Sequence, residues 1–207
     1  MQSIMISIQP KWVEKILNGE KTIEIRKTTP KCELPCKVYI YCTKPKKWYA
    51  FSSWGATSNE LLWKIKDKAK MCDVFEVWDE DAEKLNGKIV AEFTLKRVEK
   101  FSVGSLRCDD IEALSCVSYK EMIDYFFKSE ELDGNHFKFG YAWHIENLKI
   151  YNKPKLLHEF FKPCGTCDKI GTERCGEEYS DCRAKVISKA PQDWCYIQAD
   201  FQEQEEL

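Results

Sequence analysis

Short segments of alternating apolar side chains are the feature that most restricts the fold of this chain. Ile4, Ile6 and Ile8 alternate with Met5 and Ser7, a pattern that places successive side chains on opposite faces of a buried strand. The other strand-like segments are 22–26, 37–42, 72–78, 88–101, 141–151 and 194–198. Because most of these segments are short, the sequence predicts a small sheet and no long helical bundle.

Three segments carry helical signals. Pro10 suits a first helical turn, residues 12–17 place their apolar side chains on one face, and Gly19 stands where a helix cap belongs. Residues 58–70 have helical spacing, and residues 118–129 begin with Ser118 and Glu121, a capping box. Short strands mixed with a few helices predict an α+β domain built on a small, barrel-like sheet.

The length of 207 residues and an apolar content of 43% fit one domain with an elaboration, or two small domains. No apolar run reaches the roughly 20 residues that cross a bilayer, and the first residues do not resemble a signal peptide. We therefore expect a cytoplasmic protein with no membrane partner.

Charge is distributed unevenly along the chain. Residues 1–70 contain 14 Lys/Arg and 6 Asp/Glu, a net charge of +8, whereas residues 71–207 contain 18 and 28, a net charge of −10. A basic half suggests an anionic partner such as RNA or a nucleotide. An ordinary solvated surface is the alternative interpretation.

The basic half contains the segment GEKTIEIRK, residues 19–27. In an isolated strand, Glu24 and Arg26 lie on one face, where Arg26 can offer a bidentate fork to a phosphate or a carboxylate. Lys21 can supply a point charge or, if desolvated, a base. Glu24 can hold either cation or accept a proton. The alternative is an Arg–Glu pair on an exposed face of the sheet.

Other residues are candidates for contact with nucleic acid. Lys46 and Lys47, in the loop 44–54, can meet phosphates, and Trp48 can stack on a base, although such aromatics are also common in cores. Lys11 can extend this basic surface along the first helix.

Three further residues have competing interpretations. Trp143 and His144 lie on a predicted strand, where they either contact the ligand or have structural roles. Glu121 is either an acid or base facing a cleft or simply the acidic member of the capping box.

The motif Gly19-x-Lys21-x-x-Glu24-x-Arg26 resembles the signature of the ASCH domain family. The later segment GYAWHIENLKIYNKP, residues 140–154, is similar to the segment that closes the barrel in that family. The resemblance covers roughly residues 3–160. It implies a PUA-like β-barrel domain over 1–160, with a helical insertion at about 44–85, that binds RNA or nucleotides in a cleft between the barrel and its helices.

The resemblance also implies possible chemistry at Lys21 and Glu24. Some members are linked to transcription coactivation, one branch has ribonuclease activity, and another hydrolyses N4-acetylcytidine with a Lys, a Thr and a Glu. Lys21 matches the Lys of the last branch, but Glu24 stands where its Thr is expected. A carboxylate is a poor substitute for a hydroxyl nucleophile, which argues against the amidohydrolase interpretation. Glu24 as a proton acceptor favours RNA cleavage or another hydrolysis over acyl transfer to the protein.

The C-terminal part of the chain carries a group of cysteines. The spacing Cys164-x2-Cys167-x7-Cys175-x6-Cys182 fits a structural Zn²⁺ site with four thiolates. An iron–sulfur cluster and no metal are the alternatives, and Cys195 can replace Cys175 or Cys182 as the fourth ligand. We expect a zinc-binding segment over 161–200, packed on the barrel, followed by a tail over 201–207.

This C-terminal segment resembles the appendage of some phage- and prophage-borne ASCH proteins. The combined prediction is an RNA- or nucleotide-binding protein with a structural zinc site. A hydrolase that uses Lys21 and Glu24 is the first alternative. A protein-interaction module that docks a partner through the zinc knuckle is the second.

Overall fold

A five-stranded sheet carries the main core of the protein, in the strand order β10-β7-β3-β1-β13. Its strands are β1 (Ser3–Ile8), β3 (Cys36–Cys42), β7 (Ile89–Leu95), β10 (Glu146–Lys155) and β13 (Trp194–Ile197). β1 and β3 are parallel, and the other pairs are antiparallel. The computed structural model describes residues 2–44, 62–64, 71–72, 82–104, 109–127, 137–163 and 185–198.

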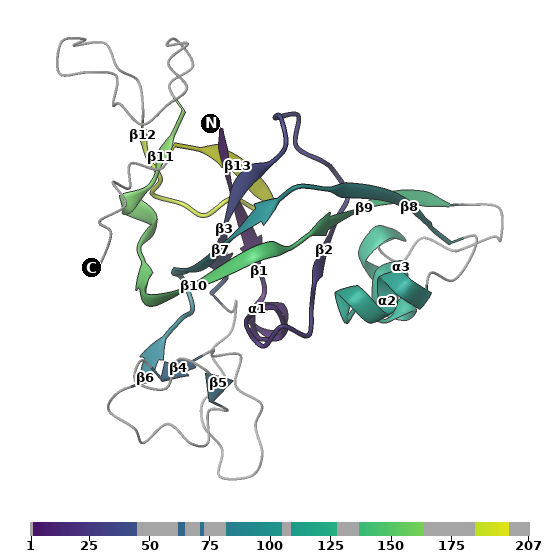
Figure 1. Cartoon of the computed structure of the whole chain (residues 1–207), viewed down its shortest axis with the longest axis horizontal. Helices are drawn as coiled ribbons and strands as arrows, with labels where there is room; N and C mark the ends of the chain where they lie inside the picture. Colours follow the sequence, from purple (N-terminus) through teal and green to yellow (C-terminus); the bar gives the residue numbers. More distant parts are fainter. Residues whose placement is uncertain are drawn as a thin grey trace.

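A second sheet has three antiparallel strands in the order β2-β9-β8. They are β2 (Ile23–Arg26), β8 (Val98–Val103) and β9 (Lys138–His144). β9 passes into β10 at Ile145, so one continuous stretch of chain joins the two sheets (Figure 1). This junction brings the charged strand β2 close to the main core.

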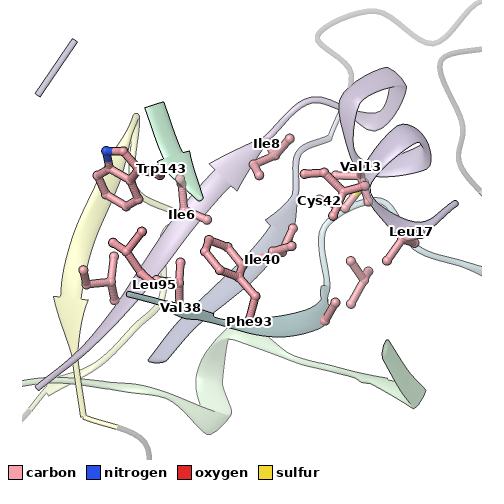
Figure 2. Close-up of a cluster of buried hydrophobic side chains, with 14 of the residues drawn as sticks. Ile6, Ile8, Val13, Leu17, Val38, Ile40, Cys42, Phe93, Leu95 and Trp143 are labelled. Carbon is pink, nitrogen blue, oxygen red and sulfur yellow. The ribbon is translucent and has the colours of Figure 1, made fainter. Parts of the chain in front are cut away.

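The two sheets share one apolar core. Ile6, Val38 and Phe93 of the five-stranded sheet cluster with Trp143 of β9 (Figure 2). All four side chains are buried. The mixed α+β class is therefore confirmed, although the strand pairings among the described residues do not close into a ring.

Helix α1 (Pro10–Leu17) follows β1 as the sequence predicts. Pro10 occupies its first turn, and Val13, Ile16 and Leu17 are buried against the core. Gly19 ends the helix at φ +76°, a backbone conformation that costs glycine little.

Two more helices, α2 (Asp109–Ser115) and α3 (Tyr119–Phe127), lie beside the three-stranded sheet (Figure 1). The capping box at the start of α3 is confirmed, because Glu121 accepts a hydrogen bond from the Ser118 backbone at 3.1 Å and donates its own backbone N–H to Ser118 Oγ at 3.3 Å. Phe126 of α3 packs with Ile23 and Ile25 of β2.

The helix predicted over 58–70 is wrong at 62–64. These residues form strand β4 (Leu62–Lys64), which pairs with β5 (Met71–Cys72) and β6 (Ala82–Lys84). Pairing with a distant segment overrides a local helical pattern, and such pairing leaves no signal within a helical window. Most of the remaining insertion expected at about 44–85 lies outside the described residues.

Two long segments that the sequence predicts as single strands each form two strands. Residues 88–101 form β7 and β8, with a break at Lys96 and Arg97, and residues 141–151 form β9 and β10, with a break at Ile145. In both cases the chain leaves one sheet and enters the other. The apolar positions change phase at each break, from Leu95 to Val98 and from Ile145 to Leu148, a signal that the prediction of single strands overlooked.

The C-terminal part of the chain returns to the main sheet. After the turn η2 (Leu157–Glu159), β11 (Phe161–Lys162) pairs with β12 (Lys185–Val186), and β13 then pairs with β1. Residues 164–184, which include all four expected zinc ligands, lie outside the described residues, as does the expected tail over 201–207. No helix in the described ranges is long and apolar enough to cross a membrane.

Candidate functional site

Strand β2 separates an apolar face from a charged face. Ile23 and Ile25 point into the helix-covered core. Strand alternation directs Glu24 and Arg26 the other way, and Lys21 lies just before the strand. The predicted assignment of the two faces is therefore confirmed.

The charged side chains form a chain of alternating sign, which we call the β2 charge network: Lys21, Glu24, Arg26 and Asp193. Lys21 Nζ lies 3.2 Å from Glu24 Oε2, and Arg26 Nη2 lies 3.0 Å from Glu24 Oε1. Arg26 Nη1 forms an ion pair with Asp193 Oδ1. Two cations and two anions balance, so the network is neutral overall.

The network is buried. Lys21, Glu24 and Arg26 are 2%, 6% and 7% exposed, respectively. The interpretation as an Arg–Glu pair on an exposed face is therefore wrong, although the pair itself exists. Removing a charge from water is costly unless the charge is paired and hydrogen-bonded, so the three residues depend on each other.

Neighbouring elements complete the surroundings. Lys21 Nζ also donates to the Ser115 carbonyl at 2.7 Å and lies 5.3 Å from the ring centre of Trp12. Arg26 Nη2 donates to the Ser7 carbonyl at 2.7 Å. Arg26 Nε is buried, and no hydrogen-bond partner for it occurs among the described residues. Such a donor is uncommon in proteins and points to a water or ligand as its partner.

A polar rim lies next to the network. Lys11 of α1 forms a 2.9 Å ion pair with Glu121 of α3, and this hydrogen bond holds the pKa of Glu121 below its usual value. One turn later, burial raises the pKa of Tyr125, whose hydroxyl also responds to the charges of Arg26 and Asp193. Glu121 therefore acts as a cap and an ion-pair partner.

This arrangement has definite chemical properties. Arg26 offers donors of the kind that bind phosphate or carboxylate groups. Both carboxylate oxygens of Glu24 are engaged, one with Lys21 and the other with Arg26. In this state Glu24 holds the two cations in place, and a role as proton acceptor requires the release of one oxygen.

Two predicted contact residues are placed differently from the expectation. Trp143 pairs with Glu24 across the strands, but it is fully buried in the core and donates from Nε1 to the Thr28 carbonyl at 3.3 Å, so it has no exposed ring face on which a base could stack. His144 pairs with Ile23 across the strands and hence faces away from Glu24. Its ring instead contacts Arg97, at 2.9 Å from Nε2.

The remaining predicted residues are not placed. Lys46, Lys47 and Trp48 lie outside the described residues, as do the four expected zinc ligands. Where the structure is described, no group of three or more His, Cys, Asp or Glu side chains is arranged to hold a metal. Cys195 lies in β13, packs beside a buried apolar cluster, and has its pKa raised by burial.

Two network partners were missed from the sequence. Asp193 is 167 residues from Arg26 along the chain and reaches it through the pairing of β13 with β1. Ser115 contributes a backbone carbonyl, which carries no sequence signal. The position of Asp193 directly before a predicted strand was visible, but the partner of that strand was not.

Comparison with solved structures identifies a fold that this chain shares. No protein-family model and no curated protein matches the sequence. The crystal structure of a single-residue mutant of ZmASCH from Zymomonas mobilis is similar, with a TM-score of 0.50 and 13% identity over 97% of this chain and 93% of that chain. A second mutant of ZmASCH gives a TM-score of 0.49 and 14% identity over 96% and 89%. The first of these similarities shows that the chain shares the fold of an ASCH protein.

Proposed function

We propose that the chain is a member of the ASCH family that binds RNA or a nucleotide at the β2 charge network. The observation that carries this proposal is the buried guanidinium of Arg26, whose Nε donor has no partner in the part of the chain that the structure describes. The motif residues Lys21, Glu24 and Arg26 are in mutual contact, as expected of parts of one site. A cytoplasmic location, where RNA and nucleotides are abundant, fits this function.

Phosphate is the group that best suits these donors. A guanidinium presents planar donors that match a phosphate, and charge-assisted hydrogen bonds are roughly twice as strong as neutral ones. Lys11 is exposed, and its Nζ lies over the same Trp12 ring as that of Lys21, so it can meet a second phosphate of a longer chain. Lys46 and Lys47 remain predicted contributors to the same surface.

Titration of single-stranded RNA over a salt series tests this function. Arg26→Lys keeps the charge but loses the planar fork, and should weaken binding by about 1–3 kcal/mol. The matched control is Arg97→Lys, an exposed arginine outside the network, which should bind as the wild type does. Replacing Lys46 and Lys47 by alanine should lower the salt slope by about one unit each. An RNA affinity that Arg26→Lys does not change would contradict the proposed site.

Hydrolysis of RNA or of a modified nucleoside is the second candidate function. It is favoured by the buried contact between Lys21 and Glu24, in which a released carboxylate oxygen can accept a proton from water or a ribose hydroxyl. Incubation with mixed RNA and with N4-acetylcytidine, with and without a chelator, tests it. Lys21→Met and Glu24→Gln should each abolish turnover. If neither RNA nor N4-acetylcytidine is hydrolysed, the catalytic proposal fails and only the binding function remains.

A zinc site in the C-terminal segment is a further part of the proposal, as in the phage-type members that the sequence resembles. It is supported by the spacing of Cys164, Cys167, Cys175 and Cys182. Elemental analysis should find about one zinc per chain, and Cys164→Ser should remove it without unfolding the sheets. A metal-free wild-type protein would contradict this proposal. If zinc is present, this knuckle is the candidate surface for a protein partner.

A further inference from the structure

The carboxylate of Asp193 sits on the guanidinium of Arg26, where an anionic ligand would bind. We propose that Asp193 is an internal substitute for a ligand phosphate, a side-chain gate that a phosphate must displace to reach Arg26. This inference rests on the proposed function, because it concerns the regulation of the same site. The residue comes from the turn before β13, far from the motif in sequence.

The partners of Arg26 differ in how readily they can be exchanged. Nη2 is held by the Glu24 carboxylate at 3.0 Å and the Ser7 carbonyl at 2.7 Å. The Glu24 side chain is 8% exposed, whereas the Asp193 side chain is 40% exposed. An incoming anion can therefore replace Asp193 at Nη1 while Glu24 stays in place. Nε, which has no partner among the described residues, lies on the other edge of the guanidinium beside Nη2, so the exchange takes place at Nη1.

The backbone around Asp193 is fixed independently of its side chain. Ser7 donates its backbone N–H to the Asp193 carbonyl at 2.9 Å and its hydroxyl to the Pro191 carbonyl at 2.7 Å. Trp194 Nε1 donates to Thr28 Oγ1 at 2.9 Å. Because these bonds do not involve the carboxylate, rotation of the Asp193 side chain opens Arg26 without separating β13 from β1.

Charge determines which ligands can open the gate. With Asp193 in place the network is neutral, and without its carboxylate the buried part carries a net charge of +1. A neutral nucleoside gains nothing from displacing a carboxylate, whereas a phosphate restores the lost ion pair at Nη1. The gate therefore selects ligands that carry a phosphate group.

Titration with inorganic phosphate, a nucleoside monophosphate and the corresponding nucleoside tests the gate by calorimetry. Asp193→Asn keeps the shape of the side chain but removes its charge, and should raise the affinity for both phosphates about tenfold, with no gain for the nucleoside. The matched control is Glu146→Gln, which removes an equally exposed carboxylate from an ion pair with Lys96 outside the network. Arg26→Lys combined with Asp193→Asn should lose the gain.

A gain no larger than that of Glu146→Gln would overturn the proposal. If Asp193→Asn does not fold, the wild type provides a second test by NMR. Phosphate should shift the Arg26 Nε–H signal and the Asp193 carboxylate signal together, and an unmoved Asp193 signal would refute displacement. RNA binding that depends on Arg26, without a phosphate gain in Asp193→Asn, refutes the gate alone. A phosphate gain without RNA binding refutes the RNA function alone.

Discussion

The ion pairs of β2 and those of the protein surface have similar distances but very different surroundings. Lys21 and Glu24 lie 3.2 Å apart with side chains that are 1% and 8% exposed. Lys96 and Glu146 lie 2.9 Å apart, with side chains that are 52% and 41% exposed. A short distance alone therefore does not show how much the fold depends on a pair.

Solvent explains the difference. At the surface, water can take over the role of a removed partner, so an exposed pair contributes about 0–1 kcal/mol to stability. In the interior, the remaining charge keeps its desolvation penalty and loses its compensation. Mutations that neutralise matched residues in the two regions can measure this contrast directly.

The largest expected effect is that of Glu24→Gln. It leaves Lys21 and Arg26 buried without the carboxylate between them, and should lower the free energy of unfolding by about 3–5 kcal/mol. Urea unfolding followed by tryptophan fluorescence measures this, since Trp143 lies in the core. The control Glu146→Gln should change stability by less than about 1 kcal/mol. If Glu24→Gln and Glu146→Gln lower the free energy of unfolding equally, the buried and exposed ion pairs do not differ in their contribution to stability.

A smaller effect is expected for Lys21→Met. The substitution keeps the apolar stem beside Trp12 but leaves the Ser115 carbonyl without this donor, and Glu24 retains Arg26 as a partner. We expect a loss of about 1–3 kcal/mol, the cost of one unsatisfied buried group. Lys15→Met, which removes an exposed pair with Glu20, is the control. If Lys15→Met destabilises the protein as strongly as Lys21→Met, burial is not the cause of the loss.

The smallest effect concerns pH and the exposed pair of Lys11 and Glu121. The hydrogen bond from Lys11 lowers the pKa of folded Glu121 below its ordinary value of 4.5. Its stabilisation is therefore fully present above about pH 4.5 and is lost as the pH falls through the lower folded pKa. Because the pair is largely exposed, this amounts to less than about 1 kcal/mol.

Comparing unfolding of the wild type and Lys11→Met between pH 3 and 6 checks this contribution. The two stability curves should differ slightly above pH 4.5 and converge at lower pH. Curves that diverge as the pH falls would contradict the assigned sign. This exposed pair is therefore expected to change the free energy of unfolding least, and Glu24→Gln is expected to change it most.

Local elements were largely predictable from the sequence. Spacing within one helical turn predicted α1 and its glycine end, and the capping box predicted the start of α3. Alternation predicted β1, β3 and the two faces of β2. These features depend on side chains a few residues apart, so a short stretch of chain contains all the information needed.

The divided strands and the strand at 62–64 were not predicted in this way, although a change of phase in the apolar pattern accompanies both divisions. A break such as Ile145 exists because the chain changes sheets there, and β4 exists because it pairs with β5 and β6. Pairing with a distant segment satisfies the backbone hydrogen bonds of both partners, whatever the local preference.

The sequence by itself determined which charges stand together in the motif of Lys21, Glu24 and Arg26, and the alternation that turns the last two to the same side. Only the tertiary structure decided that these charges are buried and that Asp193 completes the network. Burial depends on which segments cover a strand, and the energy of a charge depends on that cover more than on its neighbours in sequence. Packing therefore turned a charged strand into a buried network with a single half-exposed carboxylate at its end.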